Sequence, residues 1–159
     1  MPTEVHSRAA DKLAGTAGTI LDAKGRVVHA IGPQETVYAA VAKLSEYRIG
    51  ALFVMDGGKL VGVLSERDYA RKIILEGRAS RDTRVAEIMS SPVVYVETAT
   101  PLSDCMRLIT QKRIRHLPVM EHGEVIGVVS IGDLVQAIML QQEQTIEQLS
   151  TLITDPYPA

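Results

Sequence analysis

The residues best placed to do chemistry occur in one short pattern that is present twice. A glycine inside an apolar run is followed three residues later by a serine, and then by an aspartate after three more, at residues 62–68 and 127–133. The serines are Ser65 and Ser130, and the aspartates are Asp68 and Asp133. If a helix starts at each serine, its first turn presents free backbone N–H groups and a positive dipole end. Such a helix start attracts an anion, and its carboxylate can accept hydrogen bonds from the two vicinal hydroxyls of a ribose.

The same pattern also has a purely structural interpretation. Serine is a preferred N-cap residue, and an acidic residue three positions later can return the hydrogen bond in a capping box. Gly62 and Gly127 add weight to a binding role, because a glycine within a strand often marks close approach by a ligand or another chain. Both interpretations stay open at the level of sequence.

The pattern belongs to an internal duplication. Residues 48–73 align with residues 113–138 without a gap, at a constant offset of 65, and 11 of the 26 positions are identical. Unrelated segments would match at roughly one or two positions. The two halves of the chain are therefore copies of one unit.

Each copy predicts the order β-α-β-β-α. Short apolar runs bounded by turn residues predict strands, and apolar residues at i, i+4 and i+7 predict a helix after the first strand. The expected strands are 27–31, 51–55 and 60–64 in the first copy and 93–97, 116–120 and 125–129 in the second. The expected helices are 36–47 and 101–112, with a second helix opening at each serine of the pattern and the last one reaching Ile153.

The predicted fold class is α/β (α+β), with two repeats packed on each other, because a half of this size buries little apolar surface alone. The expected domains are an N-terminal leader at 1–18, a first repeat at 19–80, a second repeat at 81–142 and a C-terminal helix extension and tail at 143–159.

Composition excludes several classes of function. The net charge of −2 and an aromatic content of 4% without tryptophan argue against nucleic-acid binding. The apolar runs are too short to span a bilayer, and no secretory signal opens the chain, so we expect a cytoplasmic protein without a membrane partner. The single cysteine, Cys105, lies on an apolar helix stripe and is expected to be a packed small hydrophobe. The four histidines lack metal-ligand spacing, and no catalytic motif is present, so we expect neither a metal site nor an enzyme.

The duplicated unit and its pattern resemble a pair of cystathionine-β-synthase (CBS) domains, the tandem often called a Bateman module. The resemblance covers about residues 20–142, and the segments 65–90 and 112–120 are similar to those of small stand-alone bacterial members. It implies a regulatory module of pseudo-two-fold symmetry that binds AMP, ADP, ATP or NAD in the cleft between the repeats. By this resemblance Asp68 and Asp133 would hold the ribose, with Ser65 and Ser130 near the ribose or phosphate.

The resemblance also implies that the segment leading into the second strand lines the base and phosphate region. Its residues are Ile49, Gly50 and Ala51 in the first copy and Ile114, Arg115 and His116 in the second. Arginine is a natural phosphate clamp and histidine a titratable donor, so the two sites should differ, although a solvated basic edge is the alternative. Arg67 and Lys72 are further phosphate candidates, although a solvated helix face is the favoured interpretation of both.

These observations predict an adenine-nucleotide sensor that binds its ligand without turning it over, forms a homodimer and acts on an unidentified protein effector. Two alternatives remain: an interaction or scaffold module without a ligand, and an enzyme that processes a nucleotide.

Overall fold

Two small three-stranded sheets organise the chain in a computed structural model that describes residues 13–154. The strand orders are β1-β2-β3 and β4-β5-β6. Residues 26–95, with the hairpin loop 120–127, form one compact unit, here called the first-repeat unit. The remaining described residues, 13–25, 96–119 and 128–154, form the second-repeat unit.

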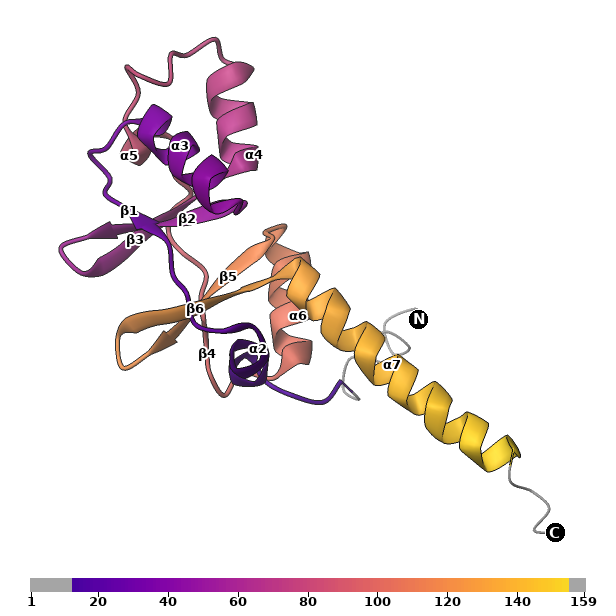
Figure 1. Cartoon of the computed structure of the whole chain (residues 1–159). Coiled ribbons are helices and arrows are strands. Elements are labelled where there is room, and N and C mark those ends of the chain that lie inside the picture. The colour runs from indigo at the N-terminus through magenta and orange to yellow at the C-terminus, as the bar shows by residue number, and fades with distance from the viewer. Residues whose placement is uncertain (1–12, 155–159) are drawn as a thin grey trace, which may run out of the picture. The chain divides into compact units, whose positions relative to one another are not determined.

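The first-repeat unit places its helices against one sheet (Figure 1). Strand β1 (Ala30–Ile31) pairs in parallel with β2 (Ala51–Asp56), and β2 pairs antiparallel with β3 (Lys59–Ser65). The helices are α3 (Val37–Tyr47), α4 (Glu66–Tyr69) with the π-helical turn η1 (Ala70–Ile74), and α5 (Val85–Ile88). Their apolar faces share one core with the sheet, whose buried members include Val37, Leu44, Leu52, Val54, Leu64, Ile73, Val85 and Ile88.

Helix α3 has clear signals at both ends. The Thr36 side chain accepts a hydrogen bond from the backbone N–H of Ala39, which satisfies one of the free donors of the first turn. Arg48 ends the helix in the left-handed region at a φ of 53°, and Arg113 does the same after α6. The repeated helix end turns the chain into the next strand in both copies.

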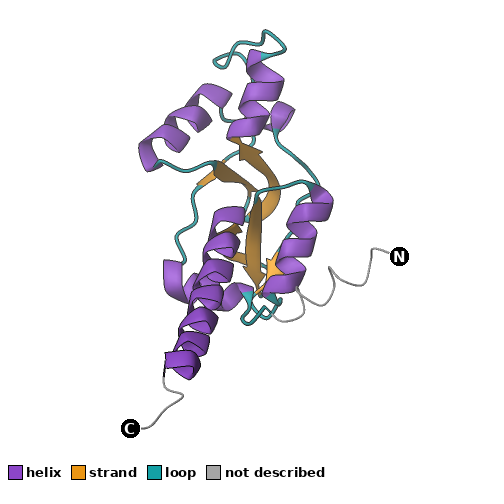
Figure 2. Cartoon of the chain, turned by 90° about the vertical axis from the view of Figure 1, so that its right-hand side faces the viewer, coloured by secondary structure: helices purple, strands orange, loops and turns teal. Residues whose placement is uncertain are grey.

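The second-repeat unit has the same order of elements. Its elements are β4 (Val96–Glu97), α6 (Leu102–Lys112), β5 (His116–Glu121), β6 (Glu124–Ser130) and α7 (Ile131–Thr154), apart from the hairpin end of β5 and β6 at residues 120–127. Figure 2 shows α7 as one continuous helix. Cys105 is fully buried here, and burial, with the charge of Asp104, raises the pKa of its thiol to about 11. The thiol therefore stays protonated at neutral pH and packs as a small apolar group, as expected.

A short helix ahead of each repeat packs against the other repeat. Helix α2 (Ala17–Lys24) precedes the first repeat, yet the backbone N–H groups of Ala17 and Gly18 donate to the carbonyls of Thr100 and Thr98 in the second. Helix α5 precedes the second repeat, and the N–H of Val85 donates to the carbonyl of Glu35 in the first. The two repeats thus exchange their leading segments.

Most of the expected elements are confirmed. The four expected helices and the two hairpins lie within a residue or two of their predicted bounds, whereas β1 and β4 are shorter than expected, with two residues each. Helix α2 was not expected. Residues 1–12 of the expected leader lie outside the described residues, and the domain boundaries and the pseudo-two-fold packing stay predictions. Within residues 13–154, none of the helices has the length and apolar character needed to cross a membrane.

Candidate functional site

The serine–aspartate pattern caps a helix in both repeats. Ser65 has an extended backbone, its Oγ accepts from the backbone N–H of Asp68 at 3.2 Å, and its own N–H donates to Asp68 Oδ2 at 2.9 Å. In the second repeat the N–H of Asp133 donates to Ser130 Oγ at 3.1 Å, and the N–H of Ser130 donates to Asp133 Oδ2 at 2.8 Å. The structural interpretation of the pattern is therefore confirmed, and it fixes each carboxylate at the start of a helix.

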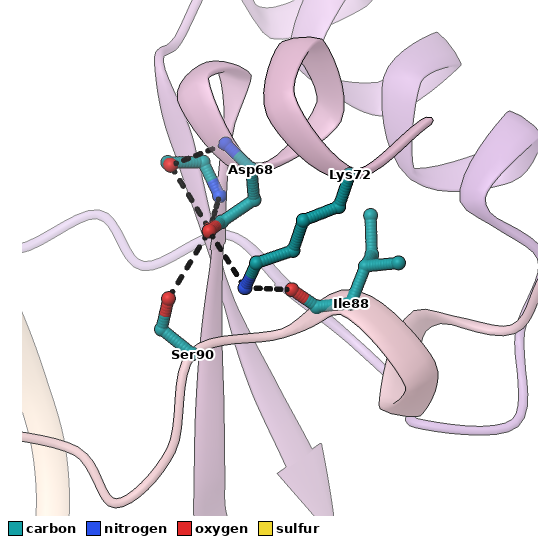
Figure 3. Close-up of polar contacts among 5 residues, drawn as sticks. Asp68, Lys72, Ile88 and Ser90 are labelled. Atoms are coloured by element: carbon teal, nitrogen blue, oxygen red, sulfur yellow. Dashed lines mark hydrogen bonds and ion pairs between the residues drawn. The ribbon is translucent and has the colours of Figure 1, made fainter. Parts of the chain in front are cut away.

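The carboxylate of Asp68 has donors on both of its oxygens, and Figure 3 shows Lys72 and Ser90 pointing towards it. Oδ2 also accepts from Ser65 Oγ at 3.0 Å, while Oδ1 accepts from Ser90 Oγ at 3.1 Å and lies 3.2 Å from Lys72 Nζ. Lys72 Nζ donates in addition to the carbonyl of Ile88 at 2.8 Å. The side chain of Asp68 is 13% exposed, so this network holds a largely buried carboxylate.

The carboxylate of Asp133 is held by a lysine from a distant part of the chain. Lys24, the last residue of α2, places its Nζ 2.7 Å from Asp133 Oδ2 and 3.0 Å from the carbonyl oxygen of Val128. Burial raises the pKa of Asp133, but the hydrogen bonds from Lys24 and Ser130 and the charge of Lys24 outweigh it and leave the pKa below its ordinary value. Asp133 is therefore ionised at neutral pH and can accept hydroxyl donors.

The segments before β2 and β5 meet the same helix starts. The carbonyl of Gly50 accepts from the N–H of Glu66 at 3.0 Å, and the carbonyl of Arg115 accepts from the N–H of Ile131 at 2.9 Å. Ala51 is the cross-strand partner of Ser65. In each repeat the backbone of the predicted base and phosphate segment therefore lies beside the predicted ribose carboxylate.

The side chains of these segments differ in exposure. Ile49 packs partly against the first-repeat core, and Ile114 and His116 are half-buried, whereas Arg115 is exposed. Arg67 is half-buried on α4. Lys72, for which a solvated face or a phosphate contact was expected, instead pairs with Asp68.

Sequence reasoning did not single out Lys24 or Ser90. Ser90 follows α5 and Lys24 ends α2, so both belong to the exchanged leading segments. The i, i+4 spacing of Asp68 and Lys72 could have indicated their ion pair. No local pattern links Lys24 to Asp133, which are 109 residues apart.

Gly62 has a structural explanation. A Cβ atom at this position would lie 2.5 Å from Met89 Sδ and 2.9 Å from its Cγ, closer than real contacts allow. The backbone N–H groups of Val63 and Ser90 each donate to the other residue's carbonyl, so this linker runs directly along β3. The close approach that the glycine indicated is made by the chain's own linker.

Two copies of a β-α-β-β-α unit, each with a capped carboxylate at its second helix, define a tandem-repeat module. Comparison with known proteins assigns that module to a family: the model of the CBS domain matches residues 22–75 and 85–140. The chain belongs to the CBS-domain family.

Related sequences come from plants and bacteria. The chain is 39% identical over 128 residues to the mitochondrial CBS domain-containing protein CBSX3 of Arabidopsis thaliana, covering 77% of this chain and 62% of that protein. It is 31% identical over 116 residues to the CBS domain-containing protein YhcV of Bacillus subtilis, covering 73% of this chain and 82% of that protein. Because the chain spans under two thirds of the Arabidopsis relative, that protein's whole activity is not assigned to it.

Solved structures share the fold. A protein with CBS domains from Burkholderia ambifaria, whose name places it in signal transduction, has a TM-score of 0.77 and 45% identity, covering 80% of this chain and 96% of that one. The hexameric CBS-CP12 protein of bloom-forming cyanobacteria has a TM-score of 0.69 and 29% identity, covering 76% and 70%.

Proposed function

We propose that the chain is a regulatory module that binds adenine nucleotides, AMP, ADP, ATP or NAD, through the ribose. The observation that carries this proposal is the ionised, half-buried carboxylate of Asp133 at the start of α7, beside the backbone of Arg115. A carboxylate in this position can accept both vicinal hydroxyls of a ribose, and the helix start favours an anionic group nearby. Asp68 is the corresponding carboxylate in the first repeat, where a ribose would have to replace some of the donors that Ser65, Ser90 and Lys72 supply.

A melting experiment tests this proposal. A ligand that binds only the folded state stabilises it by about 2.7 kcal/mol at a concentration of 100 times Kd. AMP, ADP, ATP or NAD should therefore raise the melting temperature by several degrees, in proportion to the logarithm of concentration. If none of the four raises it, the alternative of an interaction module without a ligand is favoured. Steady conversion of the added nucleotide by pure protein would instead favour an enzyme.

The second repeat should bind ligands that carry a phosphate, such as AMP, more tightly than adenosine. Arg115 and His116 stand where the first repeat has Gly50 and Ala51. Changing Arg115→Gly together with His116→Ala removes the proposed phosphate donors, and a lost hydrogen bond to a charged group costs about 1.5–3 kcal/mol. We expect AMP to bind ten-fold or more weakly and adenosine to bind as before, as measured by calorimetry. An equal loss for both ligands would mean that the change damages the fold or the base pocket.

The proposed assembly is a homodimer. Helix α7 exposes Val135, Met139, Ile146 and Leu149, whose successive spacings of four, seven and three residues place them along one face. None of these positions is charged, and α7 contains no lysine or arginine, so two copies can pair along this face without a buried charge. The hexameric CBS-CP12 protein supports oligomer formation in relatives.

Light scattering tests this assembly. We expect the mass of a dimer at tens of micromolar protein, and a shift towards monomer when Ile146→Glu and Leu149→Glu place charges on the exposed face. Gln148→Glu is the matched control, because it adds a charge to α7 outside that row. A monomeric mass for the unmodified protein would contradict the proposal.

A further inference from the structure

The lysine that holds Asp133 occupies the atom that a ribose would need. Asp133 Oδ2 already accepts two hydrogen bonds, from Lys24 Nζ at 2.7 Å and from the N–H of Ser130 at 2.8 Å. A carboxylate oxygen has about two lone-pair sites. Within residues 13–154, no residue donates to the other oxygen, Oδ1. A ribose that binds in the bidentate manner places one hydroxyl on each carboxylate oxygen, so one hydroxyl can bind at Oδ1, and the other has to take the place of Lys24 at Oδ2.

The equivalent carboxylate in the first repeat is held differently. The lysine there, Lys72, contacts Oδ1 of Asp68 at 3.2 Å and comes from the same helix, four residues on. The lysine of the second repeat comes from α2, which reaches this unit from the start of the chain. Lys24 is the last residue of α2, and Gly25 ends the helix at a φ of 99°. The contact with Asp133 therefore lies at the end of α2, just before the chain continues towards β1.

We infer that Lys24 is a specificity-determining residue of the second repeat, which competes with the ribose for Asp133 and leaves the carboxylate when a ribonucleoside binds. This inference rests on the proposed function. Because Lys24 also donates to the carbonyl of Val128, its departure breaks two contacts between the end of α2 and the rest of the second-repeat unit.

Competition of this kind distinguishes a ribose from a deoxyribose. Adenosine presents two vicinal hydroxyls and must displace Lys24, whereas 2′-deoxyadenosine presents one and can use Oδ1 alone. Both ligands are uncharged, so salt acts on the Lys24–Asp133 ion pair rather than on the approach of the ligand. The pair is partly exposed, with side chains 35% and 19% accessible, and is therefore sensitive to screening.

The test measures the affinities of adenosine and 2′-deoxyadenosine by calorimetry in the Asp68→Ala variant, in which ligand binding by the second repeat is measured without a contribution from the first. Lys24→Met should tighten adenosine binding by about three- to ten-fold and change 2′-deoxyadenosine binding by less than about two-fold. Lys112→Met, which removes an exposed charge of the same unit, is the matched control and should change neither. In the Asp68→Ala variant that retains Lys24, adenosine binding should also tighten as the sodium chloride concentration rises from about 0.01 M to 1 M.

The outcomes separate the two proposals. If adenosine binds and Lys24→Met leaves its affinity unchanged, or shifts both ligands equally, competition by Lys24 is overturned and the proposed function stands. If neither the natural protein nor any variant binds adenosine or AMP, the proposed function itself fails. If Lys24→Met does not fold, the salt dependence of adenosine binding decides, and no tightening with salt overturns the inference.

Discussion

Asp68→Ala and Asp133→Ala are each expected to lower the affinity of their own repeat for adenosine and AMP by at least about ten-fold. The physical reason is the loss of a charged acceptor for two hydroxyls, which no neighbouring group replaces. Each change also removes one arm of a capping box, which contributes about 0.5–2 kcal/mol to the free energy of unfolding. The melting temperature of the ligand-free protein should therefore fall by only a few degrees.

Asp→Asn variants separate binding from capping. Asparagine keeps an oxygen that can accept from the backbone N–H of Ser65 or Ser130, so the cap is largely retained. It lacks the charge and the second acceptor oxygen, so affinity should still fall. Asp104→Ala, which removes an exposed carboxylate on α6, is the control and should change neither property by much. Full affinity in the asparagine variants would show that the aspartates serve only as caps.

Leu21→Ala is expected to destabilise the second-repeat unit by about 2–5 kcal/mol. Leu21 is 1% exposed on α2, a helix that joins the second-repeat unit through the carbonyls of Thr98 and Thr100. Truncating a buried leucine removes apolar contact and leaves a cavity. In a chain of this size each kcal/mol lowers the melting temperature by about 2–4 °C, and hydrogen exchange should locate the loss of protection in α6 and α7.

Val27→Ala provides the comparison for Leu21→Ala. Val27 follows α2 by three residues but is 69% exposed, so its truncation should change stability by less than about 0.5 kcal/mol. If Leu21→Ala lowers the free energy of unfolding no more than Val27→Ala does, α2 does not belong to the core of the second-repeat unit. The same conclusion follows if hydrogen-exchange protection is lost in the first-repeat unit alone.

The duplicated fold was predictable because its signals are local. A helix face repeats every three or four residues and a strand alternates over a few, so α3, α6 and the two hairpins are visible in windows of about ten residues. The shared offset then assigns the same order to both copies. The edge strands β1 and β4 were over-predicted, because their two-residue pairing is set by the neighbouring strand rather than by their own apolar residues.

The exchanged leading segments could not be predicted, because their contacts are made with residues far away in the sequence. Helix α2 is only eight residues long and lies between Gly15 and Gly25, so its local helix signal is weak. Its stability comes from burying Ala17, Ile20 and Leu21 against a part of the chain about 80 residues away. The contact of Lys24 with Asp133 follows from that packing. The sequence could therefore identify the carboxylates of the candidate site, and the spacing of Lys72 from Asp68, but not the contact of Lys24 with Asp133.

The most direct test of the ribose assignment is the affinity of the natural protein for AMP and for 2′-deoxy-AMP, measured side by side by calorimetry. The two ligands share the base and the phosphate and differ by one hydroxyl. We expect AMP to bind at least about five-fold more tightly, because the gain of a hydrogen bond to a carboxylate exceeds the cost of displacing an ammonium group from it. Equal affinity for the two would contradict the account and would leave Asp68 and Asp133 as helix caps.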